Sequence, residues 1–195
     1  MEKGFTIIEL AISIFILSVA IVGIFSAFSV TTILTSDSAD RLTGTYLAQE
    51  GMEIIRNIRD TNWLNANSST WLDGLDLSAC SSGQGCEVDY TESAPHPWSY
   101  GTQDYLKINS AGFYVYDSEI PSHTKFKRMI SILPTVDANN QQADHIVLVT
   151  VAVSWDEKAT ILNPSGFSAD ICHEGRNCII VEETLYDWYN YSPAQ

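Results

Sequence analysis

The longest pattern in the chain is a run of apolar residues near its start. From Leu10 to Ser36, 27 successive residues carry no charge. As an α-helix this run reaches roughly 40 Å, which exceeds the ~30 Å hydrocarbon core of a bilayer. The run is therefore long enough to cross a membrane.

Between Asp37 and Asp60 charged residues return, but no proline interrupts the helical pattern. A set of apolar and small residues recurs there at spacings that place it on one face of a helix: Leu47, Gly51, Ile54, Ile55 and Ile58. We expect the helix to continue to about Asp60 and this face to pack on a folded domain. Gly23, Gly44 and Gly51 are expected to be its weak points.

After Gly101 the period of the pattern changes to two, which is typical of β-strands. Residues 105–108 and 113–116, separated by a turn, predict a hairpin. Residues 125–133, 146–155 and 179–186 predict three further strands. No helical segment long enough for a parallel crossover separates them, so we expect an antiparallel sheet.

Together these patterns predict an α+β fold in which one long N-terminal helix packs on a C-terminal antiparallel β-sheet. Residues 5–36 form the membrane-length half of the helix, and residues 37–60 form its amphipathic continuation. Residues 61–195 form a globular domain that opens with a loop-rich connector. Roughly 135 residues are enough for one buried core.

The charge of the chain limits its partners and orients it. Its net charge is -14, from 24 acidic and 10 basic residues, so no nucleic-acid partner is expected from bulk electrostatics. Lys3 precedes the apolar run, whereas Asp37 and Asp40 follow it. By the positive-inside rule the N-terminus stays in the cytoplasm and the C-terminal domain lies outside.

Glu9 is an ionisable residue at the edge of the apolar run, where a charge is costly and by default marks function. It ends a short motif, Gly-Phe-Thr-Ile-Ile-Glu, which begins at Gly4. A secretory signal peptide has its cleavage site after the apolar core, but here a glycine precedes that core. The motif resembles the processing site of type IV prepilins and pseudopilins.

This resemblance implies a series of events at the N-terminus. A prepilin peptidase removes the leader, residues 1–4, by cutting after Gly4, and it methylates the new N-terminal residue, Phe5. Glu9 becomes the fifth mature residue, with a role in assembly. Members of the family often carry a proline in the apolar half of the helix, whereas this chain has none before Pro95.

The implied function is that of a structural subunit of a type IV pilus-like filament, of which a minor subunit is favoured. Its partners are the membrane, the peptidase and other pilin subunits, which it contacts through the N-terminal helix. The precursor lies in the bacterial cytoplasmic membrane and the assembled subunit in an extracellular pilus. One alternative is a type II secretion pseudopilin, and another is a signal-anchored surface binding module or enzyme that does not polymerise.

The four cysteines form two short loops of equal spacing, Cys80 to Cys86 and Cys172 to Cys178. Outside the cell such cysteines favour disulfides, and we expect the two local bonds, with crossed pairing left open. A zinc site with His173 as an additional ligand is the alternative. The spacing is not the one typical of structural zinc.

No catalytic or cofactor-binding motif occurs, so we expect no enzyme, cofactor or metal. The segment between Asp137 and Asp144 places oxygen ligands at alternate positions but lacks the glycine and final glutamate of a calcium loop. We expect a solvated hairpin loop there. Lys125, Lys127 and Arg128 form the one basic cluster, which could guide DNA; we expect it instead to protect the edge of the sheet.

Overall fold

A computed structural model describes residues 6–65, 68, 70–75, 80, 85–92, 95–97, 105–117, 119–136, 142–155 and 177–188. A single helix, α1, runs from Ile7 to Leu64, four residues beyond the expected end. The described strands are β1 (Cys86–Glu87), β2 (His96–Pro97), β3 (Lys107–Ile108), β4 (Tyr114–Val115), β5 (Phe126–Val136), β6 (Gln142–Trp155) and β7 (Cys178–Tyr186). The chain divides into two compact units, Met1–Asp40 and Arg41–Gln195.

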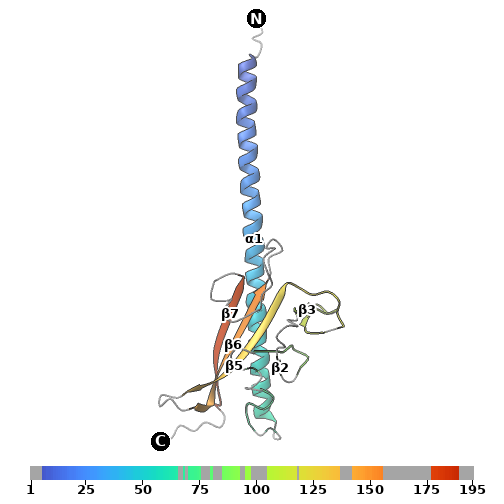
Figure 1. Ribbon diagram of the computed structural model, residues 1–195, viewed down its shortest axis with the longest axis vertical. Coiled ribbons are helices and arrows are strands. Elements are labelled where there is room, and N and C mark those ends of the chain that lie inside the picture. Colours follow the sequence, from blue (N-terminus) through green and yellow to red (C-terminus); the bar gives the residue numbers. More distant parts are fainter. Residues whose placement is uncertain are drawn as a thin grey trace. The chain divides into compact units, whose positions relative to one another are not determined.

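The strands of the second unit form one large sheet and one small one. The large sheet has the order β2-β1-β5-β6-β7 and is antiparallel throughout. Strands β5, β6 and β7 are its three long strands, seen side by side in Figure 1, and correspond to the three predicted strands. The predicted hairpin is the small sheet, β3-β4. The two-residue strands β1 and β2 were not predicted, because they are too short to show an alternating hydrophobic pattern.

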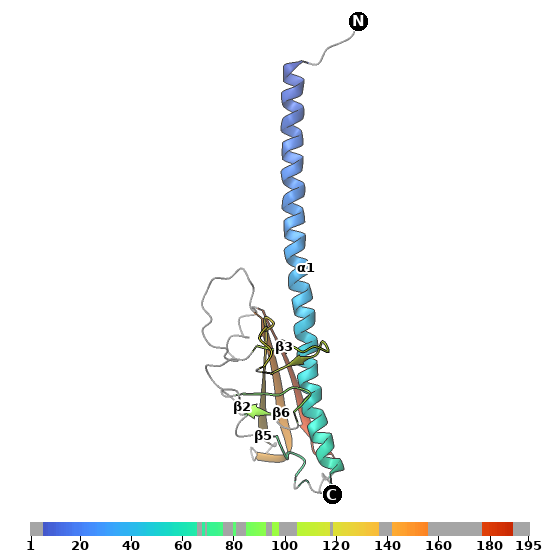
Figure 2. The same cartoon turned by 90° about the vertical axis from the view of Figure 1, so that its right-hand side faces the viewer.

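The second half of α1 lies along one face of the large sheet (Figure 2). Its buried residues follow the helical spacing of a single face: Gly44, Leu47, Ala48, Gly51, Met52, Ile55 and Ile58. From β6, the alternate residues between Val147 and Trp155 complete this core. The predicted α+β fold is confirmed, and so is the predicted packing face, with Ile54 only partly buried.

Two glycines allow the close approach of helix and sheet. A Cβ atom at Gly44 would lie 2.9 Å from Trp155 Cζ3, and one at Gly51 would lie 3.0 Å from Val151 Cγ1. A side chain at Gly44 would force the Trp155 ring to move, and one at Gly51 would require its neighbours to shift by a few tenths of an ångström. The prediction that these glycines are weak points of the helix was therefore incomplete, because both also let the helix lie close to the sheet.

The connector after α1 is attached to the sheet by the disulfide Cys80–Cys86, and both cysteines are fully buried. The backbone N–H of Ile132 on β5 donates a hydrogen bond of 2.9 Å to the carbonyl oxygen of Cys80. The disulfide Cys80–Cys86 is one of the two expected local disulfides. Because the sulfur atoms of Cys80 and Cys86 are bonded to each other, these two residues supply no thiolate to a metal.

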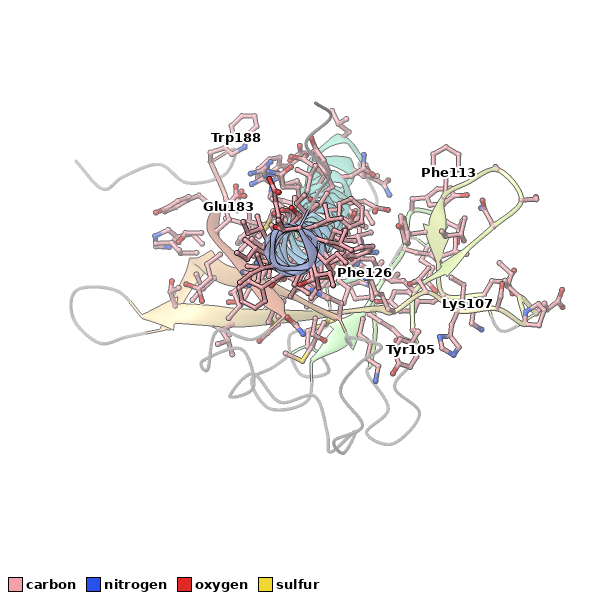
Figure 3. All side chains as sticks on the ribbon, turned by 90° about the horizontal axis from the view of Figure 1, so that it is seen from above. Tyr105, Lys107, Phe113, Phe126, Glu183 and Trp188 are labelled. Carbon is pink, nitrogen blue, oxygen red and sulfur yellow. A yellow bond between two sulfur atoms is a disulfide. The ribbon has the colours of Figure 1, made fainter. Side chains whose placement is uncertain are left out.

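Lys127 and Arg128 of the basic cluster lie on β5, and Lys125 directly precedes it. They do not protect an edge, because β5 lies between β1 and β6. Arg128 is 1% exposed and belongs to the core, as do Phe126 and Ile130 on the same face of β5. Figure 3 shows Phe126 on the side of the sheet that carries α1 and Tyr105 on the other. Lys127 Nζ lies 4.1 Å from the centre of the Tyr105 ring. The expectation of an edge device is thus wrong.

Candidate functional site: the exposed apolar half of α1

The first half of α1 exposes its apolar side chains on every side. Each residue from Thr6 to Ser36 is exposed, including large ones such as Phe15 (68%), Ile24 (70%) and Phe28 (70%). Within Ile7–Leu64 the most apolar window has a mean hydropathy of 2.7 and none of it is buried. By length and composition the helix can cross a membrane.

Most hydroxyl groups of this half donate hydrogen bonds to the helix itself. Ser29 Oγ donates to the carbonyl oxygen of Phe25 at 2.9 Å, and Thr35 Oγ1 donates to that of Thr31 at 2.8 Å. The same type of bond is made by Ser13, Ser18, Thr31, Thr32 and Ser38. A hydroxyl that donates to its own helix needs no water, so these polar residues are compatible with an apolar environment.

Glu9 lies in the first turn of α1 and is exposed. Its backbone N–H donates a hydrogen bond of 3.3 Å to Thr6 Oγ1, so Thr6 caps the helix. The pair has the Thr-x-x-Glu spacing of a capping box, and an acidic residue in the first turn also interacts favourably with the helix dipole. The spacing of Thr6 and Glu9 is a signal in the sequence from which this cap could be predicted. Any assembly role of Glu9 must be separated experimentally from capping.

Several residues singled out from the sequence lie outside the described part of the chain. These are Gly4 and Phe5 of the processing site, Cys172 and His173. Cys178 is described and is disulfide-bonded. Strand β6 begins at Gln142, inside the segment considered for calcium. The remainder of that segment, and all of its side chains, lie outside the described residues.

Arg128 was expected in an edge-protecting basic cluster but is buried between the sheet and the helix. Its guanidinium spans from sheet to helix: Nη1 donates to the carbonyl oxygen of Leu47 at 3.1 Å, and Nη2 donates to that of Val88 at 2.8 Å. Nη1 also lies 3.4 Å from Glu50 Oε2. Among the described atoms, Arg128 Nε has no hydrogen-bond partner. These contacts fix the position of the second half of α1 along the sheet.

A second ion pair joins the helix to strand β7. Arg56 donates to both carboxylate oxygens of Glu183, with Nε at 3.0 Å from Oε1, and also pairs with Glu53. The hydrogen bond to Glu183 raises the pKa of Arg56. Glu53 and Arg56 are three residues apart on the helix, a spacing at which side chains meet, whereas the partner on β7 is visible only in the fold.

The hydroxyl of Tyr116 donates a hydrogen bond of 2.9 Å to the backbone carbonyl oxygen of Arg128. Burial raises the pKa of the Tyr116 hydroxyl, and the charge of Arg128 partly offsets this increase. Among the described residues, no group of three or more His, Cys, Asp and Glu is placed to hold a metal ion. Arg128 and Arg56 connect α1 to the strands, and Tyr116 bonds the backbone of β5.

Comparisons of the chain with protein-family models, curated proteins and solved structures returned no significant match.

Proposed function

We propose that the chain is a structural subunit of a type IV pilus-like filament, anchored in a membrane by the first half of α1 before assembly. The observation that carries the proposal is the full exposure of residues 6–36 in a helix that continues into a folded domain. So much apolar surface requires an environment that the chain itself does not supply. The role is structural, without a catalytic step.

Two environments fit this surface in succession. A bilayer covers it in the precursor, with the N-terminus inside and the C-terminal domain outside, and the helices of other copies cover it in the filament. Both are apolar, so the transfer exposes no hydrocarbon to water. The hydroxyls bonded to their own helix stay satisfied in either one.

The charge of Glu9 fits assembly because it must be offset when water is removed. After cleavage between Gly4 and Phe5, the new amine would be the nearest cation in the sequence, and the next would be Arg41. The N-terminal amine of the same copy or of a neighbouring copy would offset the charge of Glu9. Pairing between copies would also set their axial offset.

The first test is to find the chain in filaments. Surface filaments sheared from cells are viewed by electron microscopy, and their subunits are analysed by intact-mass spectrometry. We expect the chain in the filaments, beginning at a methylated Phe5. Assembled chain that retains Met1 to Gly4 would contradict the processing. A chain that is surface-anchored but never found in filaments would favour the non-polymerising binding module or enzyme.

The second test separates the charge of Glu9 from its capping role. Glu9→Gln removes the charge but keeps a side chain that can complete a capping box, whereas Glu9→Val removes both. If charge pairing drives assembly, both variants enter the membrane normally and both lower the ratio of filament-borne to membrane-borne chain. A normal ratio for Glu9→Gln alone would assign Glu9 to capping.

A further inference from the structure

Leu42 and Tyr46 stand out in the second half of α1. They lie one helical turn apart and are 56% and 63% exposed. The other exposed positions from residue 41 to residue 60 are polar: Arg41, Gln49, Glu53, Asn57 and Asp60. Two large apolar side chains therefore face outward from a part of the helix that otherwise follows the pattern of a water-exposed face.

The position of this pair gives it a different energetic role from the apolar residues before it. Leu42 and Tyr46 follow Asp37, Asp40 and Arg41, so they lie beyond the charge-free run and meet water while that run is in a membrane. Moving an apolar side chain from lipid to a helix interface yields little hydrophobic free energy. Moving one from water to such an interface yields the full hydrophobic gain.

The size of the pair indicates its partner. Two side chains bury far less than the ~1,200 Å² of a specific interface, so they cannot hold a partner that arrives from solution. They can contribute only where other contacts already hold the partner nearby. A second copy of this chain meets that condition through its own apolar helix half. The acidic Asp37 and Asp40 and the basic Arg41 lie just before the pair, so an axial offset between two copies places acidic residues of one copy near Arg41 of the other.

We infer that Leu42 and Tyr46 form the water-side end of the contact between neighbouring copies, and that they supply much of the hydrophobic driving force for assembly. The inference rests on the proposed function. It locates that driving force outside the apolar run, in two residues of the folded domain's own helix segment.

The test makes the same substitution, leucine to alanine, at one position before and one position after the charged residues Asp37, Asp40 and Arg41. Leu42→Ala and Leu34→Ala remove the same atoms from side chains that are 56% and 61% exposed. Each full-length variant is expressed at the wild-type level, and the ratio of filament-borne to membrane-borne chain is measured. We expect Leu42→Ala to lower the ratio roughly fivefold or more, and Leu34→Ala to lower it by less than about twofold.

A second pair of variants tests the nature of the contact at position 46. Tyr46→Phe keeps the ring and is expected to assemble like wild type, whereas Tyr46→Gln keeps the helix but loses the apolar surface and is expected to assemble poorly. Protease resistance of the membrane-borne domain checks that each variant is folded. Both side chains are exposed, so this resistance should not change.

The outcomes separate this inference from the proposed function. If wild-type chain is absent from filaments, the proposed function fails and the inference fails with it. If wild type assembles but Leu42→Ala has no effect, or has the same effect as Leu34→Ala, the inference alone is overturned. Normal assembly of Tyr46→Gln would also overturn the part assigned to Tyr46.

Discussion

The two halves of α1 have the same backbone and opposite surroundings. Residues 6–36 are all exposed, although they are the most apolar part of the chain. The second half is more polar, yet Leu47, Ala48 and Ile55 are at most 2% exposed because the sheet covers them. Hydrophobicity alone therefore does not determine which residues of this helix the chain buries.

The difference shows how each half obtains its apolar environment. The second half meets β5 and β6 of its own chain, with glycines where the backbone must approach and Arg128 bonded to its Leu47 carbonyl oxygen. The first half has self-satisfied hydroxyls and no comparable partner among the described residues. We propose that its partners are lipids and then other copies. A substitution that destabilises the fold in the second half should therefore leave the free energy of unfolding unchanged when it is made in the first half.

The largest contrast is expected from removing the same side-chain atoms in the two halves. Ile55→Ala empties space at a fully buried position and should lower the free energy of unfolding by about 2–5 kcal/mol. Ile24→Ala, at a position that is 70% exposed, should leave it unchanged. Chemical unfolding of the full chain in detergent, followed by tryptophan fluorescence, measures both, since all five tryptophans follow residue 60. Equal losses would end the distinction between the halves.

The next contrast concerns glycine. Gly44→Ala places a methyl group 2.9 Å from Trp155 Cζ3 and should cost about 1–3 kcal/mol through overpacking, despite the better helix propensity of alanine. Gly23→Ala meets nothing within 4 Å and should leave unfolding unaltered. The same unfolding assay applies. A Gly44→Ala variant as stable as wild type would show that the helix does not need its close approach to the sheet.

The smallest expected effect concerns a single hydrogen bond inside the folded second unit. Tyr116→Phe removes the hydrogen bond to the Arg128 carbonyl oxygen and should cost about 1 kcal/mol at pH 7. The pKa of Tyr116 is raised in the folded chain, so its contribution is complete below the unfolded pKa of about 10 and is lost as the pH rises above it. Unfolding measured from pH 7 to 11 should show the wild-type advantage shrinking at the alkaline end. An advantage that grows there would contradict this.

The elements that could be predicted from the sequence are those whose hydrophobic pattern continues over many residues. The apolar helix face from Leu47 to Ile58 and the alternation in β5 and β6 were sufficient to predict a helix on an antiparallel sheet. It failed where tertiary contacts decide the outcome. Arg128 shares the inward face with Phe126 and Ile130, as the alternation required, but only the pairing of β1 with β5 reveals that this strand is internal. Gly44 and Gly51 look like helix defects until the sheet is in place.

The candidate site divides in the same way. The membrane length of the apolar run and the local disulfide Cys80–Cys86 could be predicted from the spacing of residues, whereas the assembly role of Glu9 stays a prediction from the family resemblance. The cap from Thr6 was present as a motif but was not recognised. The pair Leu42 and Tyr46 had no sequence signal, because their exposure depends on which face of α1 the sheet covers.

The most direct test of the central claim is a photocrosslinking measurement on the exposed half. A photoreactive amino acid is placed at Ile24 of the full chain, which is 70% exposed, and at Asn57, an exposed polar position of the second half, as the control. In isolated filaments the account predicts crosslinks from position 24 to another copy of the chain; in membranes of assembly-deficient cells it predicts crosslinks to lipid. The claim that other copies cover this half of α1 would be contradicted if position 24 crosslinked only to lipid in both samples although the chain was present in the filaments.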